Sequence, residues 1–196
     1  MNKIICSVVA IGTLCSLIAR DINSENDYFV GVGVHSNALS VKKTNISGNI
    51  LLARTLDDST SSISVQAGKK IENYVMSINY ESAKLDDVDM KSLYLSVDYE
   101  FETFLNPFIG ISLGMSNLKW KTDPLVNSKI KDEKLSSLLY GVQAGISYKL
   151  YKNWSIYSTI SYQKLDFKTN LIATPAKAEV THEDKTSIGV GVRYSF

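Results

Sequence analysis

Apolar residues occupy every second position over most of this chain, from Tyr28 to Phe196. Successive side chains of a β-strand point to opposite faces, so a period of two predicts strands with one apolar face. The pattern divides into eight segments, whose apolar positions span Tyr28–Val34, Ile63–Ala67, Tyr74–Tyr80, Leu93–Phe101, Pro107–Met115, Leu138–Tyr148, Trp154–Tyr162 and Ile188–Phe196. No run of about twenty apolar residues is present, which excludes a bundle of membrane-spanning helices. The sequence therefore predicts an all-β fold of eight strands.

The face opposite the apolar one carries glycine and small polar residues. Its glycines are Gly31, Gly33, Gly68, Gly110, Gly114, Gly141, Gly145, Gly189 and Gly191, interspersed with Ser, Asn and Gln. Small residues suit the crowded interior of a narrow barrel. A soluble barrel would instead expose these glycines on its surface, where they weaken strands. We therefore expect a transmembrane barrel whose apolar face points outward to lipid.

Short and long connections alternate between the expected strands. The short ones lie around Glu72-Asn73, Glu102–Asn106 and Tyr151–Asn153, and the long ones at Val41–Ser61, Leu85–Lys91, Lys119–Lys134 and Thr169–Asp184. Outer-membrane barrels have short periplasmic turns and longer extracellular loops. The pattern predicts an eight-stranded antiparallel up-and-down barrel with both termini in the periplasm. An extra strand within Thr44–Ser61 would break this parity, so we expect a loop there.

The first residues have the character of a secretory signal. A basic start at Lys3 is followed by an apolar stretch from Ile4 to Ile18 and by Ala19, just before polar residues. This order predicts a signal peptide over residues 1–19, a short segment over 20–27 and the barrel over 28–196. Cleavage there removes both cysteines, so we expect no disulfide and no cysteine metal site. The net charge of +1 argues against a nucleic-acid partner.

Aromatic residues cluster at the strand ends on the outward face. Those expected near the periplasmic rim are Tyr28, Tyr74, Tyr99, Phe101, Tyr148, Trp154, Tyr194 and Phe196, and those near the opposite rim are Tyr80, Tyr140 and Tyr162. Tyr and Trp concentrate where a membrane protein meets lipid headgroups. Two interfacial girdles are therefore predicted.

The last strand carries a family resemblance. Apolar Ile188, Val190, Val192 and Tyr194 alternate up to a final Phe196. This resembles the C-terminal strand by which bacterial outer-membrane barrels are recognised for insertion. From Tyr28 to Phe196 the chain is similar to small eight-stranded barrels, the opacity-type proteins and the membrane domain of the OmpA family. The resemblance implies an integral outer-membrane protein, monomeric, that contacts outer-membrane lipid, lipopolysaccharide and, during insertion, the barrel-assembly machinery.

Few residues offer catalytic or metal-binding chemistry. His35-Ser36-Asn37 resembles a stretch of the outer-membrane lipid A deacylases, but adjacent strand residues point to opposite faces and cannot form one catalytic pair. After the expected cleavage the chain has two histidines and no cysteine, which argues against a zinc site. Asp86-Asp87-Val88-Asp89 lacks the spacing of a calcium loop. We expect neither enzymatic activity nor a cofactor.

Charged residues also fall on the lumen face. They are Lys70, Asp98, Glu100, Lys149 and Arg193 towards the periplasmic end, and Glu81 farther out. Unpaired charges are costly inside a barrel, so these groups are expected to pair in a network that fills the lumen. The alternative is an ion path.

The loops are where we expect the function. The leading hypothesis is a structural and surface-interaction scaffold that presents four extracellular loops, used in adhesion to host or environmental ligands. The lysines of Lys42-Lys43, Lys129, Lys131 and Lys134 suit lipopolysaccharide phosphates. The alternatives are a small-solute, porin-like channel and a lipid A-modifying hydrolase.

Overall fold

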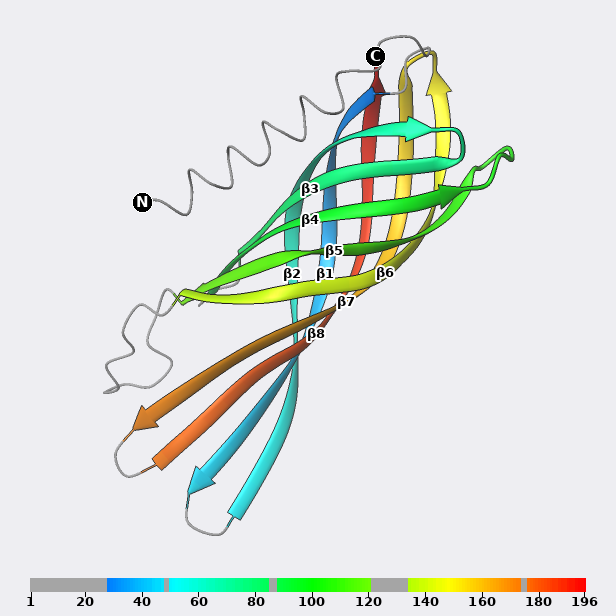
Figure 1. Ribbon diagram of the computed structural model, residues 1–196. Coiled ribbons are helices and arrows are strands. Elements are labelled where there is room, and N and C mark those ends of the chain that lie inside the picture. Colours follow the sequence, from blue (N-terminus) through cyan, green and yellow to red (C-terminus); the bar gives the residue numbers. More distant parts are fainter. Residues whose placement is uncertain (1–27, 48–49, 85–87, 121–133, 174–175) are drawn as a thin grey trace.

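The chain folds into a closed β-barrel. The computed structural model describes residues 28–47, 50–84, 88–120, 134–173 and 176–196 (Figure 1). Within these ranges eight strands pair antiparallel with their sequence neighbours, and the last pairs with the first. The strands are β1 (Tyr28–Ser47), β2 (Ile50–Ile71), β3 (Tyr74–Lys84), β4 (Val88–Glu100), β5 (Pro107–Trp120), β6 (Lys134–Tyr151), β7 (Trp154–Ala173) and β8 (Ala176–Ser195). The predicted eight-stranded antiparallel fold is confirmed.

Two predicted segments lie outside the described residues. They are the expected signal peptide over 1–19 and the short segment over 20–27. In the described part of the chain, no helix has the length and apolar character that a membrane crossing requires.

The apolar face points away from the barrel axis. Val32, Ile63 and Ile111 are 53%, 65% and 65% exposed, whereas the intervening residues Gly33, Ser64 and Ser112 are buried or nearly so. The same tendency holds in all eight strands wherever side-chain burial is described. A belt of exposed Val, Ile and Leu of this extent is unfavourable in water and is what lipid requires.

Four aromatic side chains in the lumen each stand opposite a glycine. Phe29 pairs with Gly68, Tyr94 with Gly114, Phe108 with Gly145 and Tyr157 with Gly191 in directly facing register. A Cβ atom built on Gly68 would lie 2.6 Å from Cζ of the Phe29 ring. Glycine is therefore needed on the inner face because eight strands enclose just enough space for their side chains.

Three short turns and both ends of the barrel chain lie together at one end, here called the short-turn end. Glu72, Asn106 and Lys152 have positive φ angles of 52°, 35° and 39°, as tight connections between strands require. The C-terminus lies at this end, beside the β6–β7 turn (Figure 1). The three short connections fall where the sequence predicts them.

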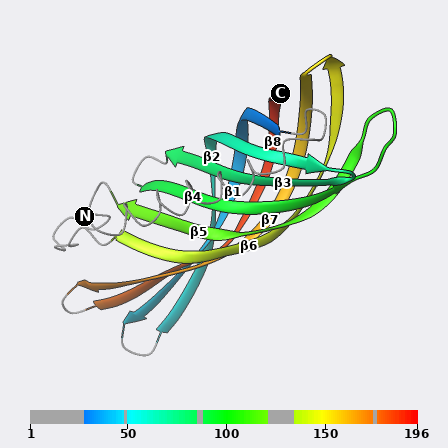
Figure 2. The ribbon, with the colours of Figure 1, turned by 45° about the horizontal axis from the view of Figure 1, so that its top comes forward.

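The longest connections differ from prediction. Most of Val41–Ser61 and Thr169–Asp184, expected as loops, continues the strands: β1 pairs with β2 up to Ser47↔Ile50, and β7 with β8 up to Ala173↔Ala176. β1 also pairs with β8 as far as Ile46↔Lys177. Residues 40–47, 50–58, 166–173 and 176–184 thus form a four-stranded projecting sheet in the order β2-β1-β8-β7 (Figures 1 and 2). Outside lipid neither sheet face must be apolar, so the period of two weakens there and the strands look like loops.

Candidate functional site in the barrel lumen

Apolar side chains close the lumen at the end opposite the short turns. Leu39, Met90, Leu118, Leu139 and Leu165 are each at most 3% exposed and pack in one cluster with Ala83 and the ring of Tyr94. They come from β1, β3, β4, β5, β6 and β7, at inward positions near the outer limit of the barrel. We call these residues the apolar cap.

A charged cluster lies directly beneath the apolar cap. The Lys185 ammonium is 2.6 Å from Oε2 of Glu81, and both side chains are buried. Oε1 of Glu81 accepts hydrogen bonds from Ser62 Oγ at 2.6 Å and from Asn37 Nδ2 at 3.1 Å. The Ser187 hydroxyl donates to Oδ1 of Asn37. Both oxygens of the buried carboxylate are therefore satisfied, which is the condition for keeping such a charge inside a protein.

Sequence reasoning missed Lys185 because the apolar positions of the eighth expected strand begin only at Ile188. The signal was present, since Lys185, Ser187, Gly189, Gly191 and Arg193 are in phase at every second position. Continuing the glycine-bearing face of β8 by two steps reaches Lys185. On β1, moving two residues along the inner face from His35 likewise reaches Asn37.

Neutral polar groups fill the middle of the lumen. Ser77 and Ser96 hydroxyls lie 2.8 Å apart, and Asn79 Nδ2 donates to both. Gln143 Nε2 donates to Oδ1 of Asp98 at 2.6 Å. These groups border a cavity of about 30 Å³, roughly a tenth of the smallest usual small-ligand site.

The predicted lumen charges form separate contacts. Lys70 Nζ lies 3.5 Å from Oε1 of Glu100. The carboxylate of Asp98 faces Gln143 instead of a cation. The Arg193 guanidinium is surrounded by aromatic rings, 4.5 Å from the centroid of Tyr157 and 5.1 Å from that of Phe29. The Lys149 side chain is exposed at the short-turn end.

The predicted deacylase-like residues do not come together. Ser36 is exposed on the outer face, whereas the ring of His35 points into the lumen beside Gly189. His35 Nε2 shares a hydrogen bond of 2.8 Å with Oγ of Ser64, a buried residue that lines the small cavity. Among the described residues, no group of three or more His, Cys, Asp or Glu is arranged to hold a metal ion.

The aromatic residues of the first girdle pack in pairs at the short-turn end. Trp154 and Tyr194 have centroids 5.0 Å apart, Tyr99 lies 5.3 Å from Tyr74 and 5.0 Å from Phe101, and Tyr148 lies 5.3 Å from Phe104. Tyr28 and Phe196 stack at 6.5 Å, and the Phe196 N–H donates to the Tyr28 carbonyl at 2.9 Å. The outward Val192 pairs with Val32 in the same seam between β8 and β1. The C-terminal residue is thus fixed to the start of β1.

Comparison with known proteins shows the family of this barrel. The family model described as Opacity family porin protein matches residues 65–196. The chain belongs to the Opacity family. Protein opa of Haemophilus influenzae is 30% identical over 101 residues, which span 50% of this chain and 82% of that protein. Membership of the Opacity family, together with the closed barrel, identifies the chain as a bacterial outer-membrane β-barrel protein.

Two solved barrels resemble this Opacity family member in fold. Neisserial surface protein A is 20% identical with a TM-score of 0.59, and the match covers 84% of this chain and 97% of that one. Outer membrane protein H of P. aeruginosa is also 20% identical, with a TM-score of 0.53 and coverage of 87% and 99%. At this identity the likeness concerns the fold alone.

Proposed function

We propose that this protein is a surface-interaction barrel, in which the membrane-embedded part is a scaffold and the projecting sheet is the binding element. The observation that carries the proposal is the pairing of β1 with β8, which continues from the barrel to Ile46↔Lys177. β2 leaves β3 after Ser62↔Ala83, and β7 leaves β6 after Leu139↔Leu165. Two hairpins are therefore joined into one sheet beyond the barrel, where a rigid scaffold commonly carries binding residues.

A closed lumen favours the scaffold over the channel. Conduction needs a continuous polar path, but the apolar cap and the Glu81–Lys185 pair occupy the section beyond the middle of the barrel. The side chains in this section come from seven strands, and those of the apolar cap, Glu81 and Lys185 are all buried. The lumen acts here as a core that stiffens the support for the projecting sheet.

The same enclosure disfavours an enzyme. The hydrogen bond between Ser64 and His35 borders a cavity of about 30 Å³. A lipid A or peptide substrate cannot enter so small a space. We therefore assign the protein a binding role without catalysis.

The proposed orientation puts the short-turn end and both ends of the barrel chain in the periplasm and the projecting sheet outside the cell. It rests on the rule that outer-membrane barrels have short periplasmic turns. In this orientation the partners are lipid and lipopolysaccharide around the barrel, the assembly machinery during insertion, and host or environmental ligands outside. The proposal includes a monomeric barrel, with residues 1–19 removed as a signal peptide.

Shortening the projecting sheet tests this function. Lys42 faces Thr55, and Lys168 faces Thr181. Replacing residues 42–55 and 168–181 each by an Asn-Gly turn therefore leaves facing strand ends joined by a connection that favours hairpins. Cells expressing the full barrel are expected to adhere to cultured epithelial monolayers, and cells expressing the shortened barrel at equal folded amounts are expected not to. Equal adherence of the two strains would contradict the proposal.

A further inference from the structure

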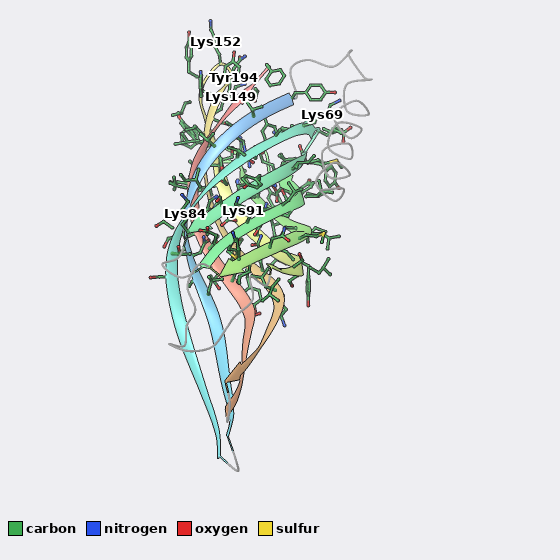
Figure 3. The ribbon with its side chains drawn as sticks, turned by 90° about the vertical axis from the view of Figure 1, so that its left-hand side faces the viewer. Lys69, Lys84, Lys91, Lys149, Lys152 and Tyr194 are labelled. Atoms are coloured by element: carbon green, nitrogen blue, oxygen red, sulfur yellow. The ribbon has the colours of Figure 1, made fainter. Side chains whose placement is uncertain are left out.

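A second cavity opens at the short-turn end of the barrel, remote from the projecting sheet. Its volume is about 370 Å³, within the range of small-ligand sites. Lys70, Glu100, Lys149, Lys152, Trp154 and Arg193 are among the residues that line it. Figure 3 shows Lys149 and Lys152 together at this end, away from Lys84 and Lys91 at the other end of the short strands. We call this space the vestibule.

The lining of the vestibule has an excess of positive charge. It contains four cationic side chains, Lys70, Lys149, Lys152 and Arg193, and one carboxylate, Glu100. Glu100 contacts Lys70 at the long distance of 3.5 Å. Asp98 lines the smaller cavity together with Arg193 and accepts a hydrogen bond from Gln143. Counting Asp98 as well, two positive charges remain uncompensated.

Arg193 forms the inner wall of the vestibule, and its guanidinium group is not fully used in hydrogen bonds. Its side chain is 8% exposed, and its Nε has no hydrogen-bond partner within the described ranges. Phe29, Phe108 and Tyr157 surround the guanidinium with centroids 5.1, 6.0 and 4.5 Å away. Aromatic faces stabilise a cation without occupying its N–H groups. Arg193 is therefore held in position, at the junction of both cavities, and can still donate to an anion.

We propose that the vestibule binds an anionic phosphate ester. A phosphate group matches several cations better than a monocarboxylate does, because it has more acceptor oxygens and suits the forked donors of arginine. Arg193 binds it at the inner wall, and Lys149 and Lys152 bind it at the mouth. Phe29, Val75 and Trp154 in the lining contact the organic part of the ester.

Two sources can supply this chemistry, a phospholipid headgroup or a soluble phosphate ester. Trp154 connects the vestibule with the membrane, since it lines the cavity and also packs against outward Tyr194 in the aromatic girdle. This contact brings the cavity rim to the level at which lipid headgroups lie. The experiment therefore includes one arm for each source.

The test uses the refolded full-length barrel in nonionic detergent. The chain has two tryptophans, so a Trp120→Phe variant leaves Trp154, in the cavity lining, as the only tryptophan reporter. Its fluorescence is titrated with sn-glycerol 3-phosphate, with glycerol as the uncharged control. A second arm uses mixed micelles containing phosphatidylglycerol, with zwitterionic phosphatidylcholine micelles as the control.

The variants distinguish binding in the vestibule from a general effect of positive charge. Lys149→Gln with Lys152→Gln removes two vestibule cations, whereas Lys69→Gln with Lys91→Gln removes two from outward positions. Lys69 is adjacent to Lys70 in sequence and lies over the Tyr28 ring on the outer face. We expect saturable binding that weakens at least tenfold in the first pair and less than twofold in the second. All four lysines are partly or fully exposed, so folding is retained.

Each outcome bears on the proposal. Saturation by glycerol phosphate assigns a soluble ester as a competent ligand, and saturation by phosphatidylglycerol alone assigns the lipid headgroup. If neither compound gives saturable binding, or if both lysine pairs weaken binding equally, the proposed site is wrong. The result is independent of adherence through the projecting sheet, because the two regions lie at opposite ends of the barrel (Figure 1).

Discussion

The side chains of Lys185 and Glu81 form an ion pair across the barrel, with Nζ and Oε2 2.6 Å apart. They are 104 residues apart in the sequence, on β8 and β3, which are not neighbours in the sheet. β1 and β2 separate these strands and contribute Asn37 and Ser62 to the same cluster. The pair therefore joins two strands that share no backbone hydrogen bonds, in addition to the backbone ladders between neighbours.

Removing one partner of this pair is expected to destabilise the barrel strongly. Lys185→Met leaves the Glu81 carboxylate buried without its counter-charge, and such losses cost about 3–5 kcal/mol of unfolding free energy. Lys185→Met combined with Glu81→Gln removes both charges and is expected to recover at least half of the loss. Urea unfolding of the refolded barrel in lipid vesicles, followed by tryptophan fluorescence, measures both variants.

Lys91→Met is the control for this pair, because Lys91 is an exposed lysine on β4. It is expected to change the unfolding free energy by less than about 0.5 kcal/mol. Additive effects of the Lys185 and Glu81 substitutions would show that the two groups do not depend on each other.

A second prediction concerns the fit between His35 and Gly189. The atoms nearest to a Cβ built on Gly189 all belong to the His35 ring. Gly189→Ala is therefore expected to cost about 1–3 kcal/mol through overpacking, and His35→Ala in the same chain to relieve most of that cost. The same unfolding experiment measures this rescue. Ala38→Val, at an exposed position of β1, is the control. A Gly189→Ala variant with wild-type stability would contradict the close packing of His35 against Gly189.

The sequence predicts the membrane-embedded part of the barrel better than the rest. Inside lipid, one face must be apolar and the other must fit a narrow lumen, so Val30 to Val34 and Gly31 to Gly33 reveal both faces of β1. Beyond lipid this double constraint ends, and the strand continuing through Lys42 to Ser47 has no such pattern. The sequence also does not predict which lumen side chains pair with each other. The pairing of Lys185 with Glu81 depends on the register of four strands.

The proposed orientation predicts which positions are accessible from outside the cell. Single cysteines at Ser59 and Ala176, at the end that carries the projecting sheet, are expected to react with a membrane-impermeant maleimide on intact cells. Cysteines at Asn73 and Asn153, in the short turns, are expected to react only after the outer membrane is opened. Equal labelling of both sets on intact cells would contradict the orientation.

Phe196 is predicted to act as an insertion signal. Deleting Phe196, or replacing it by Asp, is expected to lower the amount of folded barrel in the outer membrane at least severalfold. Its ring is 54% exposed at the rim, so its burial contributes little to stability. The purified variant is therefore expected to refold in detergent, as measured by heat-modifiable gel mobility. Failure in both settings would make Phe196 a structural residue, and success in both would remove its signalling role.

The central claim is that the lumen is a closed core and that the barrel acts as a scaffold. Single-barrel conductance in a planar lipid bilayer tests it most directly, with an open general porin as the positive control. Because the apolar cap and the Glu81–Lys185 pair occupy the lumen at the end opposite the short turns, the account predicts insertion without steady current. A steady ohmic current for every inserted barrel, at the size expected of an open pore, would contradict it.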